Sequence, residues 1–353
     1  MPHLFEPFLA RGLTADNRIV VSPMCMYSSD DGFANDFHLV HLGSLAMGGA
    51  GVVVTEATAV SAEGRISPQD LGIWKTEHVP ALQRVVRFVH EQGALILTQL
   101  AHAGRKGSTH APGKGHGGVP QDAGGWVPVA PSALAYAPDY PQPAALDQAG
   151  LRGIVDSFAE AARRATMAGF DGVEVHAAHG YLLHEFLSPL SNQRTDAYGG
   201  SLEGRSRLLR EVIQAVRAAL REDQWLWVRI SASDWVEGGW NLEDSVALAS
   251  QLRALGVDLI DVSSGGNDPR QQIPIGPGYQ VPFSERIRRE AQIPTAAVGL
   301  IREPKQAEQI LAEGRADLVA LARAVLREPH WPLLAAEALG AQGRWPRQYL
   351  RAR

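Results

Sequence analysis

The chain has 353 residues, of which 45% are hydrophobic and 20% charged, so it can bury a large core and does not have the composition of a disordered protein. Its formal net charge of -5 comes without any run of lysine and arginine, which favours small-molecule chemistry over binding to nucleic acid or to a membrane. The N-terminus does not read as a secretory signal, no stretch is long and apolar enough to cross a bilayer, and Cys25 is the single cysteine. We therefore expect a cytoplasmic protein without disulfides.

Short β-rich apolar runs alternate with longer segments of helical periodicity, a pattern typical of repeated βα units around a parallel sheet. The amphipathic segments include 80–91, 148–168, 201–221 and 241–255. The eight apolar runs are 19–22, 51–56, 95–100, 172–176, 226–230, 259–262, 295–298 and 318–321. Eight units predict an α/β protein with one (β/α)8 TIM-barrel domain over 1–353, the competing fold being a doubly wound open sheet.

The ends of these runs carry chemically capable residues, and a barrel would gather them around one mouth, whereas an open sheet would spread them along an edge. They are Cys25, Glu56, Gln99, His176, Arg229, Ser263, Gly299 and Arg323. Residues 101–147, after the third run, are rich in Gly, Pro and His with little helical periodicity. So long an irregular connection predicts a lid or capping insertion over the mouth, and we expect an N-terminal cap before the first strand.

Two glycine-containing patterns bear on phosphate binding. Residues 113–118 (GKGHGG) match Gly-x-Gly-x-x-Gly, but no strand precedes them and no helix pattern follows, so we reject a dinucleotide site there. Gly299 follows the seventh run, and Ala322 with Arg323 follows the eighth. Barrels often bind phosphate at these two turns with backbone N–H groups and an arginine, so we expect a phosphate-bearing ligand, although a rim salt bridge would also account for Arg323.

The segment 176–189 (HAAHGYLLHEFLSP) places two imidazoles and a phenol directly after the fourth run. His176 and His179 could ligate a metal, but no third ligand lies in register, so we assign no metal. They could instead be structural, or could donate two N–H bonds to a substrate oxygen that gains negative charge, with Tyr181 supplying a proton. Cys25 reads equally as a buried small hydrophobe and as a residue of the mouth.

These residues belong to a series that resembles the Old Yellow Enzyme family of flavin-dependent ene-reductases, and within it the thermophilic-like bacterial branch that contains this cysteine. The series begins with 17–25 (NRIVVSPMC), 56–60 (EATAV) and 99–106 (QLAHAGRK). It continues through 176–189 into 191–200 (SNQRTDAYGG), 228–234 (VRISASD) and the Ala322–Arg323 turn. So many matches in order extend over almost the whole chain.

The resemblance implies a TIM barrel that holds FMN noncovalently at its mouth. Backbone groups around Pro23, Met24, Cys25 and Ala57 would face the flavin, and Gly299, Ala322 and Arg323 would hold its phosphate. Gln99 and Arg229 would bond the pyrimidine edge, where a guanidinium stabilises the negative charge of reduced flavin. The cysteine would tune the flavin, and Lys106 is a matched position without an assigned contact.

The resemblance also implies the reaction. NADPH, or NADH, would reduce FMN, and an α,β-unsaturated carbonyl compound, a quinone or a nitro compound would then be reduced on the same flavin face. His176 and His179 would bind the carbonyl oxygen, Tyr181 would protonate the α-carbon, and Tyr27 would contact the substrate. Residues 348–351 (QYLR), within a C-terminal tail at 340–353, resemble the segment that carries an arginine, here Arg351, into the neighbouring subunit's site. A homodimer or a dimer-based homotetramer follows.

Two departures from the family pattern are visible. Ala322 stands where glycine is usual before the phosphate-binding arginine. The extra methyl group should be tolerated if the backbone at this position is not left-handed. Gly204 replaces a common asparagine, and we expect only a local adjustment. Two other functions stay open: a flavin-free barrel lyase or aldolase acting on a phosphorylated substrate, and a flavin-binding protein without catalysis.

Overall fold

The computed structural model describes residues 2–352 and contains a closed barrel of eight parallel strands. The strands follow one another around the barrel in chain order, with β12 pairing back to β3. The predicted TIM barrel is therefore confirmed, and each of the eight apolar runs forms one strand. They are β3 (Ile19–Val21), β4 (Val52–Ala59), β5 (Leu95–Ala101), β8 (Gly172–Ala177), β9 (Trp225–Ser231), β10 (Leu259–Ser263), β11 (Thr295–Ala297) and β12 (Leu318–Leu321).

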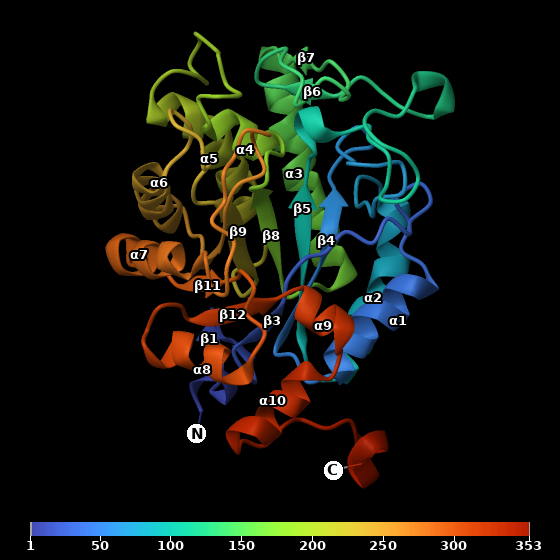
Figure 1. Ribbon diagram of the computed structural model, residues 1–353. Coiled ribbons are helices and arrows are strands. Elements are labelled where there is room, and N and C mark those ends of the chain that lie inside the picture. The colour runs from blue at the N-terminus through green and yellow to red at the C-terminus, as the bar shows by residue number, and fades with distance from the viewer. Residues whose placement is uncertain (1, 353) are drawn as a thin grey trace.

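Helices surround this barrel (Figure 1). They are α1 (Asp36–Met47), α2 (Val79–Glu91), α3 (Gln148–Ala168), α4 (Leu182–Leu187), α5 (Leu202–Ala219), α6 (Leu242–Ala254), α7 (Val281–Ala291), α8 (Pro304–Ala312), α9 (Arg323–Arg327) and α10 (Trp331–Leu339). Local sequence fixes several of their ends. Asp147 caps α3 by accepting a hydrogen bond from the Gly150 N–H at 2.8 Å, and Gly169, at φ 89°, ends the helix.

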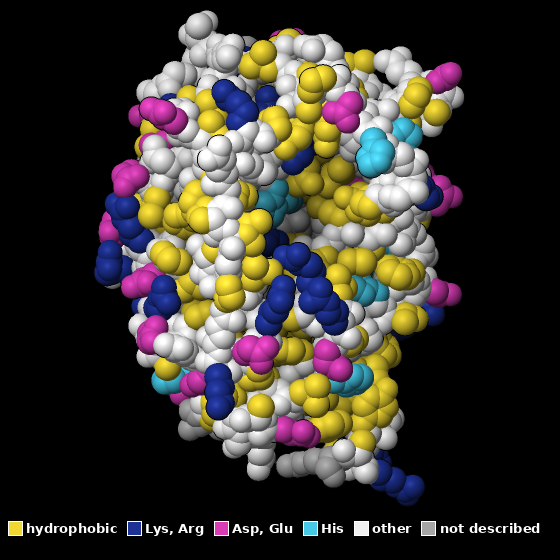
Figure 2. All heavy atoms as spheres, viewed as in Figure 1, with side chains coloured by type: hydrophobic (Ala, Val, Ile, Leu, Met, Phe, Trp, Pro, Cys, Tyr) yellow, Lys and Arg dark blue, Asp and Glu magenta, His cyan; other side chains and the backbone are white. Residues whose placement is uncertain are grey.

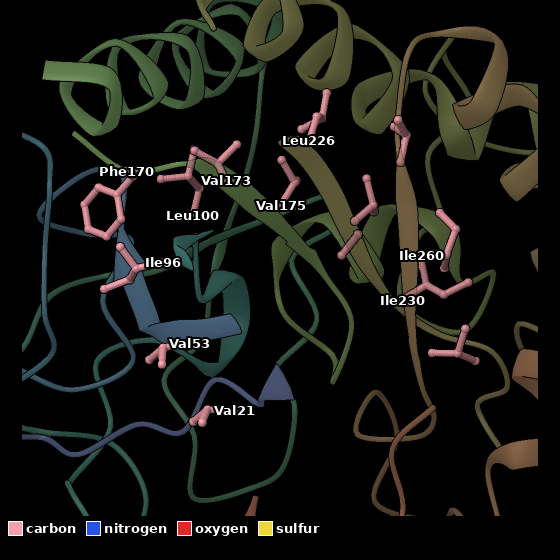
Figure 3. Packing of buried hydrophobic residues seen from close by; sticks show 14 of the residues in the cluster. Val21, Val53, Ile96, Leu100, Phe170, Val173, Val175, Leu226, Ile230 and Ile260 are labelled. Atoms are coloured by element: carbon pink, nitrogen blue, oxygen red, sulfur yellow. The ribbon is translucent and has the colours of Figure 1, made fainter. Parts of the chain in front are cut away.

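The strands separate two layers of apolar side chains. Alternate residues point outward and pack under the helices, as Val173, Val175 and Leu226 do in Figure 3. Residues of the opposite parity fill the barrel, among them Leu97, Trp227 and Leu259. This alternation sends Gln99, Glu174, His176, Arg229 and Asp261 inward near the carboxyl ends of their strands. A polar layer therefore lies above an apolar barrel core.

The first residues close the other end of the barrel. The hairpin of β1 (Phe8–Ala10) and β2 (Leu13–Ala15) follows η1 (His3–Phe5), and Ala15 packs into the barrel's inner cluster. The Trp225 indole N–H donates to the Ala10 carbonyl at 2.7 Å. The hairpin is the expected N-terminal cap.

The insertion after β5 holds only short elements: η3 (Gly104–Lys106), η4 (Gln121–Ala123) and the two-residue strands β6 (Val129–Ala130) and β7 (Ala144–Ala145). Figure 1 shows β6 and β7 beyond the carboxyl end of β5. Trp126 fastens this insertion to the loop after β4, because its indole N–H donates to the Glu63 carbonyl at 2.9 Å and its ring lies 4.9 Å from the Arg65 guanidinium carbon. No described helix, in residues 2–352, is both long enough and apolar enough to cross a membrane.

Candidate active site

The loop after β8 brings His176, His179 and Tyr181 together. The His176 ring centroid lies 5.2 Å from that of His179 and 5.0 Å from that of Tyr181, with both pairs close to perpendicular. His176 is 3% exposed, and its Nδ1 has no hydrogen-bonding partner among the described residues 2–352. Since a buried polar atom without a partner is costly, this nitrogen is available for a ligand.

Both imidazoles are neutral at physiological pH. Burial lowers the pKa of His176 and of His179 well below its usual value, and the nearby positive charge of Arg229 lowers both further. A neutral imidazole carries one N–H, so each ring offers one donor and one acceptor. The pair can therefore bind an oxygen atom without adding charge to the site.

The His179 backbone is held in the left-handed region, at φ 60°. Its N–H donates to Ser231 Oγ at 2.9 Å, and its carbonyl accepts from Lys106 Nζ at 2.8 Å. Its ring nitrogen Nε2 lies 2.7 Å from Ser263 Oγ. Such backbone conformations persist where surrounding contacts impose them, and they are concentrated at functional sites.

Tyr181 precedes α4, and burial raises its pKa well above the usual value, with smaller contributions from Cys25 and Tyr27. Its phenol is therefore protonated at neutral pH and can act as a donor. The loop is anchored behind it, because the Gly180 N–H donates to His184 Nδ1 at 2.9 Å and His184 Nε2 lies 2.9 Å from Asp234 Oδ1.

Cys25 and Tyr27 lie on the loop after β3. Burial raises the pKa of the Cys25 thiol well above its usual value, and the carboxylates of Asp70 and Glu56 add to the effect, so the sulfur keeps its proton. The Ala57 backbone partly opposes this rise in the pKa of the thiol. Tyr27 is at φ 51°, and its pKa is raised mainly by burial. Pro23 and Met24, on the same loop, are half-buried.

The inward polar layer contains Gln99 and Arg229, together with two acids. Gln99 Nε2 donates to Glu174 Oε1 at 2.7 Å, and Arg229 Nε lies 3.2 Å from Asp261 Oδ2. Within the part of the chain that the structure describes, the Arg229 Nε makes no well-aligned hydrogen bond. A buried guanidinium with donors to spare suits an electron-rich heterocycle edge.

Gly299, Ala322 and Arg323, the residues predicted to bind phosphate, line one cavity of about 160 Å³. A whole cofactor site occupies about 300–1,000 Å³, so this cavity has room for only one part of such a ligand. Gly299 is at φ 133°, which only glycine adopts readily, and a Cβ there would lie 3.0 Å from Gln280 Nε2. Ala322 is at φ -113°, so its methyl group fits the turn.

These groups fit FMN on structural grounds. The Arg229 Nε is a buried polar atom without a well-aligned partner among residues 2–352, and the Gly299 turn offers a cradle that a side chain would narrow. On the face of the molecule seen in Figure 2, the surface has a hollow with histidine at its edge and lysine or arginine side chains beside it. A ring at the mouth and a phosphate between β11 and β12 match the donors present.

Arg351 is the one predicted site residue that the fold does not bring to the mouth of its own barrel. It lies in η5 (Arg347–Ala352), and its side chain is exposed. The C-terminal end of the chain projects beyond α10 (Figure 1).

A barrel mouth with an inward arginine, a neutral histidine pair and a separate phosphate-sized cavity defines a class of barrel enzyme built around a phosphorylated cofactor. The chain belongs to the NADH:flavin oxidoreductase / NADH oxidase family, whose model matches residues 3–342. It is an oxidoreductase.

Individual relatives agree with this family. An NADPH dehydrogenase of Geobacillus thermodenitrificans is 50% identical over 350 residues, which cover 99% of this chain and 98% of that protein. The solved structure of an Old Yellow Enzyme homologue from Zymomonas mobilis is 29% identical, with a TM-score of 0.77 over 97% of this chain and 94% of that one. Morphinone reductase in complex with tetrahydroNAD is also 29% identical, with a TM-score of 0.78 over 97% and 92%.

Glu174 and Asp261 are absent from the site predicted by sequence, because that prediction considered the ends of strands rather than their interiors. Each is the only acid in a run of apolar residues. An acid at an inward position of a buried parallel strand is unusual enough to have indicated them.

Proposed function

We propose that the protein is an FMN-dependent ene-reductase that takes hydride from NADPH, or from NADH, and reduces α,β-unsaturated carbonyl compounds. The observation that carries the proposal is the neutral His176–His179 pair beside a protonated Tyr181 at the mouth of a barrel of this family. The names of the relatives support a nicotinamide donor, since one is an NADPH dehydrogenase and another was solved with tetrahydroNAD.

Specific residues would hold the cofactor. Gly299, Ala322 and Arg323 would bind its phosphate, Gln99 and Arg229 would bond the pyrimidine edge, and the backbone at Pro23, Met24 and Ala57 would face the ring. When bound, FMN supplies a carrier that accepts hydride from the nicotinamide and passes it to the substrate. The Cys25 thiol, which keeps its proton, would offer a weak S–H donor beside the ring.

The histidine pair would bind the substrate's carbonyl oxygen. Two N–H donors aimed at one oxygen withdraw charge from the conjugated system and stabilise the enolate-like charge that develops when hydride reaches the β-carbon. Ser231, Ser263 and Lys106 hold His179 in place, so the donors need little reorganisation. Quinones and nitro compounds present similar oxygens and fall within the same proposal.

Tyr181 would then deliver the proton to the α-carbon, and Tyr27 would contact the substrate from the opposite loop. Burial favours the neutral phenol, and transfer of its proton leaves a phenolate 5.1 Å from Lys106 Nζ, measured to the ring centroid. The lysine's positive charge would stabilise that phenolate until solvent reprotonates it. Lys106 thus gains a role that its sequence position alone did not assign.

The partner subunit's Arg351 would complete the substrate site. A site shared in this way requires a homodimer or a dimer-based tetramer. Residues 340–352 would act as an intersubunit tail, and residues 101–147 would act as a lid.

The test begins with the purified protein. We expect a flavin absorption spectrum, release of FMN on denaturation, and bleaching of that spectrum by NADPH without oxygen. Turnover with a cyclic enone should give the saturated ketone. A protein that neither contains nor takes up FMN would overturn the proposal. A flavin that NADPH reduces but no enone reoxidises would also overturn it, in favour of a flavin-binding protein without catalysis.

A further inference from the structure

Four buried polar side chains meet inside the barrel, one layer below its mouth. Gln99, Glu174, Arg229 and Asp261 come from the adjacent strands β5, β8, β9 and β10, and none is more than 6% exposed. Gln99 donates to one oxygen of Glu174, and Arg229 faces one oxygen of Asp261. With both acids ionised, the other oxygens, Glu174 Oε2 and Asp261 Oδ1, have no donor among residues 2–352.

The two carboxyl groups lie within hydrogen-bonding reach of each other. Two carboxylates cannot make such a bond without a proton between them, and two unshielded negative charges in this apolar barrel would be costly. Burial and the Asp261 charge raise the pKa of Glu174 to about 8, while Arg229 opposes the rise for Asp261. Arg229 Nε lies 3.2 Å from Asp261 and favours the ionised form of that acid, so we place the shared proton on Glu174.

Four other titratable groups lie close enough to Arg229 for its charge to shift their pKa values, and none of them is charged at neutral pH. The pKa values of Cys25 and Tyr279 are raised mainly by burial, and those of His176 and His179 are lowered mainly by burial. Asp261 is thus the carboxylate that offsets the guanidinium, among the residues 2–352.

We propose that Glu174 and Asp261 are positioning residues that share one proton and thereby set how much of the Arg229 positive charge acts on the flavin. The inference rests on the proposed function, because Arg229 would face the pyrimidine edge, where reduced flavin is negative. An ionised Asp261 weakens the pull of Arg229 on that charge. The protonated Glu174 keeps Asp261 in place by donating to it, and Gln99 keeps Glu174 in place.

The variants Asp261→Asn and Glu174→Gln distinguish the two carboxyl groups. Asp261→Asn removes the offsetting charge, so reduced FMN should gain about tenfold in affinity relative to oxidised FMN, which raises the two-electron reduction potential by about 30 mV. Glu174→Gln replaces a protonated acid by an amide that can still accept from Gln99 and donate to Asp261, so its potential should stay near that of the wild type. Asp258→Asn is the matched control, because Asp258 directly precedes β10 at the end of the barrel away from the mouth, and its potential should match that of the wild type.

The potentials are measured on the holoenzymes by anaerobic equilibration with a reference dye. A shift in Glu174→Gln with none in Asp261→Asn would overturn the assignment, and so would equal shifts in both. If Asp261→Asn does not fold, infrared difference spectra of the wild type against Glu174→Gln test the shared proton instead. The wild type should show a protonated carboxyl band that the variant lacks. A missing band would overturn the inference in a protein that still binds and reduces FMN, whereas loss of FMN binding by the wild type would overturn the proposed function instead.

Discussion

At the scale of single residues, the proposed chemistry depends on groups that burial keeps uncharged. His176 and His179 are neutral, Tyr181 and Cys25 keep their protons, and Arg229 supplies the fixed positive charge. A site of this kind polarises an uncharged substrate through N–H donors and protonates it with a phenol, and it needs no general base near pH 7.

Tyr181→Phe removes the proton donor and leaves the ring in place. We expect flavin reduction by NADPH to be little changed, and reoxidation by an enone to slow by about 10²- to 10⁴-fold. Stopped-flow measurement of the two half-reactions separates them. Tyr198→Phe, whose hydroxyl bonds Glu211 on the outer surface, is the control and should match the wild type. Equal slowing of both halves in Tyr181→Phe would contradict a proton-donor role.

Replacing both His176 and His179 by alanine removes the proposed oxygen clamp. Hydrogen bonds to a charged group contribute about 1.5–3 kcal/mol each, so phenolate ligands should bind at least about tenfold more weakly while FMN stays bound. Titration of the flavin spectrum with a phenol measures this affinity. His90→Ala, on the outer surface beside Asp171, should have no effect. Unchanged phenol affinity in the double variant would eliminate the clamp.

At the scale of elements, the sequence predicted the barrel because each inner strand is a short apolar run between helical periods. It missed β6 and β7, since two-residue strands leave no periodic pattern. That Gly299 and Ala322 line one cavity was predictable from their positions after two neighbouring strands, and phosphate binding there stays a prediction. The network that holds His179 was not, because Ser231, Ser263 and Lys106 come from distant parts of the chain.

Gly204, at the start of α5, lies close to the backbone of the preceding turn. A Cβ at this position would lie 2.1 Å from the Gly199 carbonyl oxygen, a backbone atom that cannot move freely. Gly204→Ala should therefore lower the free energy of unfolding by about 1–3 kcal/mol. Gly153→Ala, on α3 with open space around it, should raise that energy by up to about 1 kcal/mol. Urea unfolding of both variants measures the contrast, and equal stability would contradict the crowding.

At the scale of the whole molecule, the chain forms one barrel, and its exposed C-terminal tail lies away from the mouth of that barrel. Only the sequence resemblance suggests that the partner subunit's Arg351 would reach the site, because a single chain cannot reveal what its tail touches. We expect the protein to sediment as a dimer or a tetramer.

Hybrid dimers test the shared site. One subunit carries Tyr181→Phe and the other carries Arg351→Ala, and each parent homodimer should be weakly active. If Arg351 acts across the interface, one site of the hybrid contains both native groups and activity returns. Arg347→Ala is the control, and its homodimer should stay as active as the wild type. No recovery in a hybrid that forms would contradict the shared site.

The most direct test of the central claim is a single turnover of the reduced protein with a cyclic enone in the absence of oxygen. The holoenzyme is first reduced with one equivalent of NADPH, and the flavin spectrum is then followed as the enone is added. We predict complete reoxidation with one saturated ketone formed per FMN. A flavin that stays reduced, or an allylic alcohol as product, would contradict hydride delivery to the β-carbon.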